Sequence, residues 1–465
     1  MEAEPCEWRN LSPGDLSYEF PSVASGHLTE TVARSQKAFG EWSALCLDER
    51  RAYLSECREN LQSKAEDIAR LISRETGKPL REARLEMSAV IGKFDLTFED
   101  GEKYLRDVQV ADGPHPARIR KVPRGPAAVI SPFNFPVHLG HGATVAYLLA
   151  GNTVVLKPSP LAVNTALAYA LAMESALPDG VFQLLPGWGQ VGHDLCLHRD
   201  IRSVCFTGSI PVGKALSASL AEDYSKSLAL ELGGKNSAIL CHDADPDLAA
   251  TAIADGLCLT AGQRCNATAR VLVHRSIAGQ FLSRLESSLA RYVPADPLDE
   301  STMLGPLISF AALDRYQALI SISAGDWIIP GGVLEMNSKG QHGYYVLPAV
   351  MLATENAVLD ESPLAKSEIF APVLVVEMFD DEAAAIRRHE AWAFGLTASI
   401  FTSEEETFAR IGNALSVGNL YRNLPTTFSP STLPFGGWGA SGNGRAGARG
   451  FVRFAVKEQA LQWKV

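Results

Sequence analysis

The sequence predicts an α/β protein with at least two domains. Its 465 residues exceed the roughly 250–300 residues that one hydrophobic core usually supports. From residue 124 onward, short apolar and β-branched runs alternate with stretches of helical spacing, and a second series of the same kind begins near residue 233. Repeated strand–helix–strand units predict parallel sheets that helices cover on both faces.

Composition and charge narrow the class of protein. Hydrophobic residues make up 46% and charged residues 20% of the chain, which is typical of globular proteins and excludes disorder as the main state. The 42 basic and 53 acidic residues give a net charge of −11, which argues against a nucleic-acid-coating protein and a polybasic membrane binder. The acidic start lacks the apolar segment of a signal peptide, and no uncharged apolar run reaches about 18 residues. We therefore expect a cytoplasmic protein without a membrane span.

The first hundred residues predict helices. Apolar residues spaced three and four apart over 48–73 predict one amphipathic helix, with Asp48 as its N-cap. Gly77 and Pro79 end this segment. A second helix is predicted over 80–102.

The alternation that follows predicts a first parallel sheet. Strands are expected at 127–130, 153–156, 181–185 and 202–206, with helices at 138–150, 162–177 and 189–198. Ligands of such sheets bind at the carboxyl ends of the strands. Lys157, Gly187 and residues 207–209 fall at these ends, so we expect a ligand site there.

A second series predicts a second sheet. Strands are expected at 237–240, 270–273, 373–377 and 396–401, with a helix from about Leu248. Outside both series, residues 118–123 and 451–456 alternate polar and apolar side chains, which indicates exposed or edge strands.

Two glycine-containing turns are candidates for phosphate binding. Gly187-Trp-Gly-Gln-Val-Gly192 follows a predicted strand and matches the G-x-G-x-x-G pattern of dinucleotide sites, but a tight strand-to-helix turn gives the same pattern. Phe206-Thr-Gly-Ser209 leads into a helix, whose free N–H groups and dipole attract phosphate. The alternative is an ordinary capped helix with Ser209 as N-cap and Pro211 in the first turn.

Three side chains are candidates for chemistry, and each has a structural alternative. Cys265 lies in a glycine- and arginine-containing segment that suits a reactive thiol, although most cysteines are inert and buried. Glu231 ends an apolar stretch, so it is either functional or part of a buried ion pair, for instance with Lys235. Asn134 lies between two prolines, where its side-chain amide is suited to donate to an oxyanion. The alternative is an ordinary asparagine of a turn. None of the eight cysteines forms a Cys-x-x-Cys pair, so we expect reduced thiols and no metal site.

Together these segments resemble the NAD(P)-dependent aldehyde dehydrogenase superfamily over about residues 30–445. The matching motifs are Ser131-Pro-Phe-Asn-Phe-Pro136, Lys157-Pro-Ser159, Phe206-Thr-Gly-Ser209 with Gly213, Glu231-Leu-Gly-Gly-Lys235, Gly262-Gln-Arg-Cys265, Glu368-Ile-Phe370, and Pro434-Phe-Gly-Gly437 with Ser441-Gly442. The resemblance implies an aldehyde dehydrogenase-like fold that forms a homodimer or a dimer of dimers. The implied parts are a Rossmann-type cofactor domain (1–104 and 124–232), an α/β catalytic domain (233–440) and oligomerisation strands (105–123 and 450–465).

The resemblance also assigns roles to residues. It implies that Cys265 is the nucleophile, that Asn134 and the Cys265 backbone N–H hold the oxyanion, and that Glu231 activates water. The implied cofactor contacts are Ser131, Lys157, Ser159, Gly208, Ser209, Gly213, Leu232, Glu368 and Phe370. Pro160 replaces the glutamate that often follows this Lys-Pro-Ser turn, so NAD is expected while NADP use stays open.

Within the superfamily, the sequence is most similar to N-succinylglutamate 5-semialdehyde dehydrogenases of arginine catabolism. The shared features include Arg74-Glu-Thr-Gly-Lys-Pro79 with Glu82-Ala83, Leu259-Thr-Ala-Gly-Gln-Arg-Cys265 and Asn423-Leu-Pro-Thr-Thr427. Tyr421 and Phe428-Ser-Pro430 depart from that group at the expected substrate mouth. Arg264 or Arg422 is a candidate to bind a substrate carboxylate.

Other functions remain open at this point. A broad-specificity or different semialdehyde dehydrogenase fits the same motifs. Reduction of acyl phosphates or thioesters on a related fold is disfavoured by Glu231, the implied deacylating base. A catalytically silent protein on this scaffold is disfavoured because it would not require Cys265, Glu231 and Asn134 together.

Overall fold

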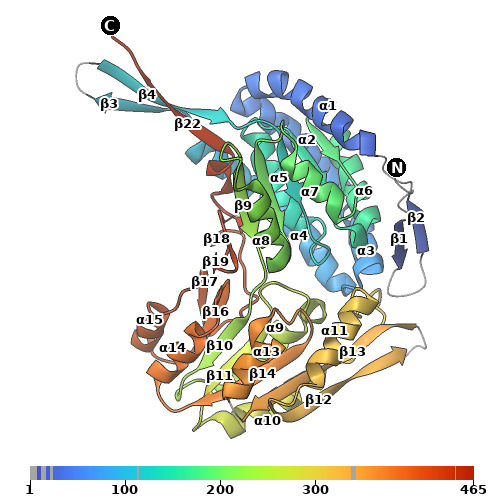
Figure 1. The fold of residues 1–465 in the computed structure, drawn as a ribbon, viewed down its shortest axis with the longest axis vertical. Coiled ribbons are helices and arrows are strands. Elements are labelled where there is room, and N and C mark those ends of the chain that lie inside the picture. The colour runs from blue at the N-terminus through green and yellow to red at the C-terminus, as the bar shows by residue number, and fades with distance from the viewer. Residues whose placement is uncertain are drawn as a thin grey trace.

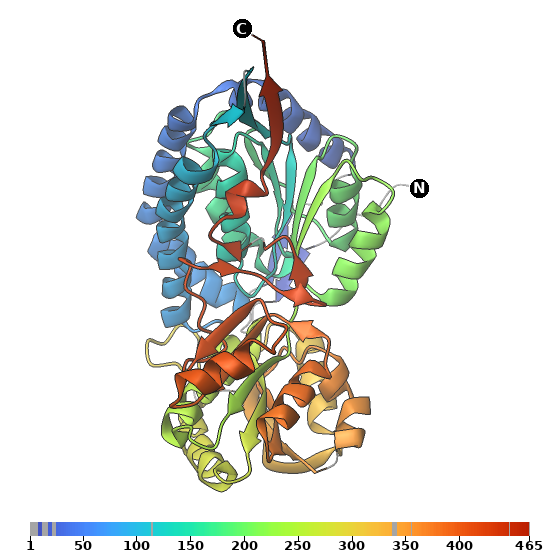
Figure 2. The same cartoon turned by 90° about the vertical axis from the view of Figure 1, so that its left-hand side faces the viewer.

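The computed structural model describes residues 8–11, 17–20, 25–112, 115–336, 342–354, 356–445 and 447–464. Two lobes dominate it, each built on one large sheet, and a narrow arm projects from the first lobe (Figures 1 and 2). A separate antiparallel pair, β1 (Trp8–Leu11) and β2 (Ser17–Phe20), lies beside the first lobe. No helix in the described part of the chain is long and apolar enough to cross a membrane.

The first lobe contains a six-stranded sheet in the order β20-β9-β8-β5-β6-β7. Its strands are β5 (Ala127–Ile130), β6 (Val154–Lys157), β7 (Phe182–Leu184), β8 (Ser203–Thr207), β9 (Ser227–Glu231) and β20 (Gly442–Asn443). The connecting helices are α5 (His138–Leu149), α6 (Val163–Glu174), α7 (Gly189–Leu197) and α8 (Ile210–Leu220). All pairs are parallel except β20 with β9, so the four predicted strands are confirmed. The sequence analysis did not identify β9.

Four N-terminal helices belong to the same lobe: α1 (Ser25–Ala44), α2 (Leu47–Ser63), α3 (Ala65–Thr76) and α4 (Leu80–Tyr104). The single helix predicted over 48–73 is therefore wrong, because the chain leaves helical geometry at Lys64 (φ −106°, ψ 5°). The apolar spacing continues through this break, with Leu61 and Ile68 both buried, so periodicity alone does not reveal it. The predicted stop is confirmed at Gly77, which takes φ +73°.

The start of α2 also differs from the prediction. Asp48 is inside the first turn, and the N-cap is Cys46. The Cys46 thiol accepts a hydrogen bond from the Glu49 N–H, and the Glu49 carboxylate accepts one from the Cys46 N–H. This reciprocal arrangement is a capping box in which cysteine takes the place of serine or threonine.

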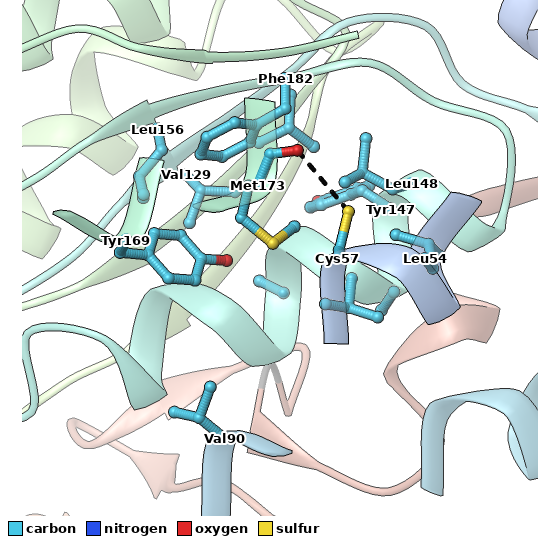
Figure 3. Packing of buried hydrophobic residues seen from close by; sticks show 14 of the residues in the cluster. Leu54, Cys57, Val90, Val129, Tyr147, Leu148, Leu156, Tyr169, Met173 and Phe182 are labelled. Carbon is cyan, nitrogen blue, oxygen red and sulfur yellow. Dashed lines mark hydrogen bonds between the residues drawn. The ribbon is translucent and has the colours of Figure 1, made fainter. Parts of the chain in front are cut away.

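Packed helices hold the carboxyl edge of the first sheet in place. Buried side chains of α2, α4, α5 and α6 share one core with Val129, Leu156 and Phe182 of the sheet, and Figure 3 shows Val90 of α4 farther from these sheet residues than the side chains of α6. The Cys57 thiol donates to the Met173 carbonyl at 3.6 Å, which joins α2 to α6. Burying each large apolar side chain contributes about 1.5–3 kcal/mol, so this core stabilises the sheet whose strand ends line the cavity described below.

The second lobe contains a seven-stranded sheet in the order β12-β13-β14-β11-β10-β16-β17. Its strands are β10 (Asn236–Leu240), β11 (Thr268–His274), β12 (Gly325–Met336), β13 (His342–Ala353), β14 (Val373–Phe379), β16 (Thr397–Phe401) and β17 (Asn419–Arg422). Its helices are α9 (Pro246–Cys258), α10 (Ala278–Leu289), α11 (Phe310–Ile320), α12 (Asn356–Glu361), α13 (Pro363–Lys366), α14 (Glu382–Glu390) and α15 (Glu405–Gly412). The four predicted strands are confirmed, whereas the antiparallel pair β12–β13 and the edge strand β17 were not identified.

The arm is a three-stranded antiparallel sheet of β3 (Val108–Asp112), β4 (His115–Pro123) and β22 (Val456–Gln462). It confirms the strand predicted at 118–123 and extends away from the second lobe (Figure 1). The strand predicted at 451–456 is wrong, because η3 (Phe451–Arg453) is a 3-10 turn. Phe451 is buried edge-on against Tyr147 at 5.4 Å between ring centroids, so its side chain serves the core of the first lobe.

Short elements complete the chain. They are η1 (Pro160–Ala162), η2 (Leu259–Gly262), β15 (Phe394–Gly395), β18 (Pro434–Phe435), β19 (Trp438–Gly439) and β21 (Gly447–Ala448). The C-terminal segment first pairs with the second lobe through β15–β19 and then crosses to the first lobe, where β20 pairs with β9. This crossing places residues 434–443 beside the end of β9.

Candidate active site

A cavity of about 460 Å³ lies at the carboxyl ends of β5, β6, β8 and β9. Its walls come from both lobes, since Cys265, Glu368 and Phe370 of the second lobe face residues of the first. The predicted site residues that line it are Ser131, Asn134, Lys157, Ser159, Gly208, Ser209, Glu231, Leu232, Cys265, Glu368 and Phe370. Segments far apart in sequence therefore meet in one cavity, at the sheet edge that the sequence analysis selected.

The loop before Cys265 has an unusual backbone. Thr260 and Ala261 both take φ +53°, a region that side-chain-bearing residues rarely adopt. Gly262 follows with φ +70°, and a Cβ there would lie 2.5 Å from the carbonyl carbon of Ala371. Only glycine fits this close approach, so the loop presses directly against the segment that carries Phe370.

Asn236 fixes the other side of this loop. Its Nδ2 donates to the carbonyls of Cys265 and Ala267, both at 2.8 Å. Its Oδ1 accepts from the Thr397 N–H at 3.1 Å. One buried amide at the start of β10 thus ties the backbone of the cysteine to two strands of the second sheet.

The surroundings of Cys265 raise the pKa of its thiol. Burial raises the pKa of Cys265 to about 12, with added contributions from Glu368 and Glu231, while Arg264 acts in the opposite direction. The thiolate is the nucleophilic form of cysteine. The surroundings of Cys265 therefore favour the thiol over the thiolate.

Asn134 is oriented towards the cysteine loop. Its Nδ2 donates to the Gln263 carbonyl at 2.9 Å, and its Oδ1 accepts from the Phe135 N–H at 3.1 Å. The side chain is only 3% exposed. Because an amide nitrogen carries two N–H donors, Asn134 has a second donor for a ligand in the cavity that it shares with Cys265.

Glu231 is the last residue of β9, and its backbone carbonyl accepts from the Gly208 N–H at 3.0 Å. Its carboxylate borders Gly436, where a Cβ would lie 2.6 Å from Oε1. Lys235, the ion-pair partner considered from the sequence, instead donates from Nζ to the Ser367 carbonyl at 2.6 Å. Burial lowers the pKa of Lys235 to about 7.

Lys157 and Ser131 provide polar groups to the first-lobe wall. Lys157 ends β6, and burial lowers the pKa of its ammonium to about 8. The Ser131 hydroxyl is buried and has no hydrogen-bond partner among the described residues. Both groups are therefore available to a polar ligand in the cavity that they line.

The turn into α8 presents backbone donors to the cavity. Ser209 is at the N-cap position and Pro211 is in the first turn, as considered from the sequence, but the Ser209 side chain makes no capping hydrogen bond. Such a helix start suits an anionic group. Gly213 lies beneath the surface, where a Cβ would come 2.6 Å from Cδ2 of Leu232, so it lets the helix approach that lining residue.

Glu368 and Phe370 form the second-lobe wall. Burial raises the pKa of Glu368 to about 7. The carboxylate lies so close to the Gly233 backbone that a Cβ there would be 2.3 Å from Oε2. Phe370 takes φ +53° and packs edge-on against Phe133, with ring centroids 5.9 Å apart.

Other residues are placed differently from the expectation or were missed. Neither Arg264 nor Arg422 is among the lining residues: Arg264 binds Glu82, and Arg422 donates to the carbonyls of Thr402 and Ser403. Of the G-x-G-x-x-G turn, Gly189 and Gly192 line the cavity. The sequence analysis missed His193 of α7 and Arg315 of α11, which also line it. Neither belongs to a local motif, so only their position in the fold identifies them.

The cavity fits a dinucleotide. An unpartnered serine hydroxyl, a buried lysine, a buried carboxylate and an uncapped helix N-terminus surround it. The hydroxyl, the lysine and the carboxylate suit hydrogen bonds to ribose hydroxyls. The backbone N–H groups of the helix N-terminus suit a pyrophosphate.

Comparison with known proteins decides the family, because the model of the aldehyde dehydrogenase family matches residues 2–460. The chain belongs to the aldehyde dehydrogenase family. Its relative N-succinylglutamate 5-semialdehyde dehydrogenase 1 of Caulobacter vibrioides is 35% identical over 453 residues, or 96% of this chain and 94% of that protein. The α/β fold and the assignment as an NAD(P)-dependent oxidoreductase acting on aldehydes are thereby confirmed.

Solved structures similar to this chain agree in fold. An NADP-dependent enzyme of E. coli superposes with a TM-score of 0.91 at 27% identity, covering 99% of this chain and 95% of that one. Indole-3-acetaldehyde dehydrogenase in complex with NAD+ gives a TM-score of 0.89 at 30% identity, covering 99% and 93%. The names of these two structural neighbours thus include both NADP and NAD+.

Proposed function

We propose that this aldehyde dehydrogenase converts an aldehyde, NAD(P)+ and water to a carboxylic acid through a thioester on Cys265. The observation that supports this best is the common cavity of Cys265, Asn134 and Glu231. A nucleophile, an oxyanion donor and a carboxylate base are the three groups that this chemistry requires.

In the first step the Cys265 sulfur attacks the carbonyl carbon. The thiol proton leaves to solvent, so the Glu231 carboxylate remains available as the base of the second step. The oxyanion accepts hydrogen bonds from Asn134 Nδ2 and the Cys265 backbone N–H, and one such donor typically contributes about 3–4 kcal/mol to the transition state. The hydrogen bond from Asn134 to the Gln263 carbonyl fixes the orientation of this amide before the substrate binds.

Bound NAD(P)+ supplies the acceptor for the hydride that leaves the substrate carbon. Lys157 and Glu368 would hold ribose hydroxyls, Ser131 and Phe370 would border the nicotinamide side, and Gly208 and Ser209 would face the pyrophosphate. After this oxidation Glu231 takes a proton from water, which attacks the Cys265 thioester. The acid leaves, and the Cys265 sulfur regains a proton.

For the substrate we propose N-succinyl-L-glutamate 5-semialdehyde. The support is the 35% identity to an enzyme of that name over nearly the whole chain, together with the motifs shared with that group. Arg264 and Arg422 bind other partners, so their places give no support to the proposed carboxylate contacts. Another semialdehyde, or a broad range of aldehydes, is the competing substrate assignment.

We propose NAD as the cofactor on the resemblance to the family, whereas Pro160 leaves NADP use open. Pro160 lines the cavity at the start of η1, where no carboxylate is present to repel a 2′-phosphate. NADP use is therefore tested beside NAD. The domain boundaries, a homodimer or dimer of dimers joined through the arm, and a cytoplasmic location also stay proposals.

The deciding experiment follows reduced-nicotinamide absorbance with NAD or NADP and a panel of acidic and neutral aldehydes. We expect turnover that prefers NAD and the succinylated semialdehyde, and that disappears in Cys265→Ser. Glu231→Gln should accumulate an acyl-enzyme adduct visible by intact mass. Turnover with other aldehydes alone would reject the substrate. No turnover and no adduct in a folded, NAD-binding protein would favour a silent scaffold.

A further inference from the structure

The motif at the junction of α3 and α4 has no role in the chemistry above. Lys78, Glu82 and Glu86 are spaced four residues apart, and all three are at most 3% exposed. Lys78 Nζ donates to Glu86 Oε2, and Glu86 Oε1 accepts from the N–H groups of Val137 and His138, at 3.1 and 3.0 Å. The Glu86 carboxylate thus binds both Lys78 and the start of α5, which directly follows the Asn134 segment.

Glu82 reaches the cysteine loop of the other lobe. Its Oε2 accepts from Arg264 Nη2 at 2.7 Å and from Thr260 Oγ1 at 2.9 Å. Arg264 Nε donates to the same Thr260 oxygen at 3.0 Å. The three side chains form a closed hydrogen-bonded triangle that spans the left-handed residues before Cys265.

Phe135 lies between the two cations. Lys78 Nζ is 3.8 Å and Arg264 Cζ is 4.9 Å from the centroid of its ring. A cation over an aromatic face is attracted by the ring quadrupole, more strongly when water is excluded. Because Phe135 follows Asn134 directly, this stack joins the amide donor to the cysteine loop.

We infer that Glu82 and Arg264 are positioning residues that hold Cys265 and Asn134 in their relative places, with Thr260 as the bridge. This inference rests on the proposed roles of Cys265 and Asn134. Left-handed conformations at non-glycine residues persist only where surrounding contacts hold them, and the triangle supplies these contacts at Thr260. Arg264 also offsets part of the rise in the pKa of Cys265 that burial causes.

The same contacts argue against Arg264 as the carboxylate-binding residue of the substrate site. Its side chain is 14% exposed and already pairs with a 2%-exposed carboxylate. Turning the guanidinium to a substrate would leave the buried Glu82 carboxylate with the Thr260 hydroxyl and with Arg81 Nη2 at 3.8 Å, beyond hydrogen-bond distance, which is unfavourable.

The test uses Arg264→Met, Glu82→Gln, their double variant and Thr260→Val in the full chain. Arg58→Gln is the matched control, because Arg58 pairs with Asp95 on the exposed face of α2 and α4. Misplacement of reacting groups by about 1 Å can cost on the order of 100-fold in rate. We expect kcat to fall about 10- to 100-fold in Arg264→Met, with the KM of aldehyde and NAD within about threefold.

Two further readouts separate positioning from general damage. The rate of Cys265 alkylation by iodoacetamide, measured without cofactor or aldehyde, should fall about tenfold in Arg264→Met and not in Arg58→Gln. The double variant should lose no more than the worse single variant, since both remove one network. If Arg264→Met does not fold, the same kinetic and alkylation measurements are made on Arg264→Lys and Thr260→Val.

Three results would overturn the inference. They are a kcat within twofold of wild type in both Arg264→Met and Thr260→Val, alkylation rates equal to wild type, and a loss confined to the KM of acidic aldehydes. The alkylation readout needs no turnover, so an inactive wild-type protein would reject the proposed dehydrogenase reaction and leave this test intact.

Discussion

The two halves of the cavity are built by different means. The half proposed to bind the cofactor, called the cofactor half, includes Ser131, Lys157, Gly208 and Ser209 at the ends of parallel strands and the start of a regular helix. The nucleophile half, around Cys265, depends on left-handed residues and on buried side-chain contacts such as those of Asn236. Regular secondary structure positions backbone donors for a large ligand, whereas a single reacting sulfur needs side chains that lock a strained loop. Changes in the nucleophile half should therefore reduce kcat, and changes in the cofactor half should weaken cofactor binding.

The largest effect is expected for Asn134→Ala. It removes the proposed oxyanion donor while Cys265 stays in place, so kcat should fall about 100- to 1000-fold with the KM for NAD within about threefold. Steady-state kinetics in both substrates measure this split. A loss carried mainly by the KM for NAD would contradict the division between the halves.

Lys157→Met tests the cofactor half. A hydrogen bond to a charged group contributes about 1.5–3 kcal/mol, so NAD affinity should fall about 10- to 100-fold. Isothermal titration measures affinity, and iodoacetamide alkylation reports on the other half. Slower alkylation of Cys265 in the free protein would show that the halves are not independent.

Asn236→Ala addresses the anchor of the nucleophile loop. The change removes three hydrogen bonds and leaves the Thr397 N–H and two carbonyls without this partner. We expect the free energy of unfolding to fall by about 1–3 kcal/mol, with a smaller loss of kcat than for Asn134→Ala. Urea unfolding checks the first and steady-state kinetics the second, and an unchanged stability would mean that water replaces the amide.

The sequence predicted the fold class and most of the parallel strands because buried strands have a local signature of β-branched and apolar residues. It missed the break at Lys64, where the apolar spacing continues, and it placed the last strand too early, because Phe451 serves the core rather than a sheet. The motif residues gather in one cavity, but their catalytic roles stay predictions. The contact of Arg264 with Glu82 spans 182 positions, and local patterns carry no information about such a pairing.

The smallest effect concerns Lys235, which donates to the Ser367 carbonyl one residue before Glu368 of the cavity wall. Burial, together with Arg270, lowers the pKa of Lys235 to about 7, whereas a lysine in the unfolded chain titrates near about 10.4. Between these values the unfolded chain binds a proton that the folded chain does not, so the free energy of unfolding rises with pH from about 7 to 10.

Lys235→Met removes this contribution. Wild type should gain about 0.5–1 kcal/mol per pH unit relative to the variant, below the limit of about 1.4 kcal/mol for one fully titrating group. Urea unfolding at pH 7, 8 and 9 measures the difference, and Lys214→Met on the exposed face of α8 is the control. The test compares how steeply the free energy of unfolding changes with pH, and not its absolute value, because the variant also leaves the Ser367 carbonyl without its lysine donor. Parallel curves for wild type and Lys235→Met would mean that this ammonium stays charged in the folded protein.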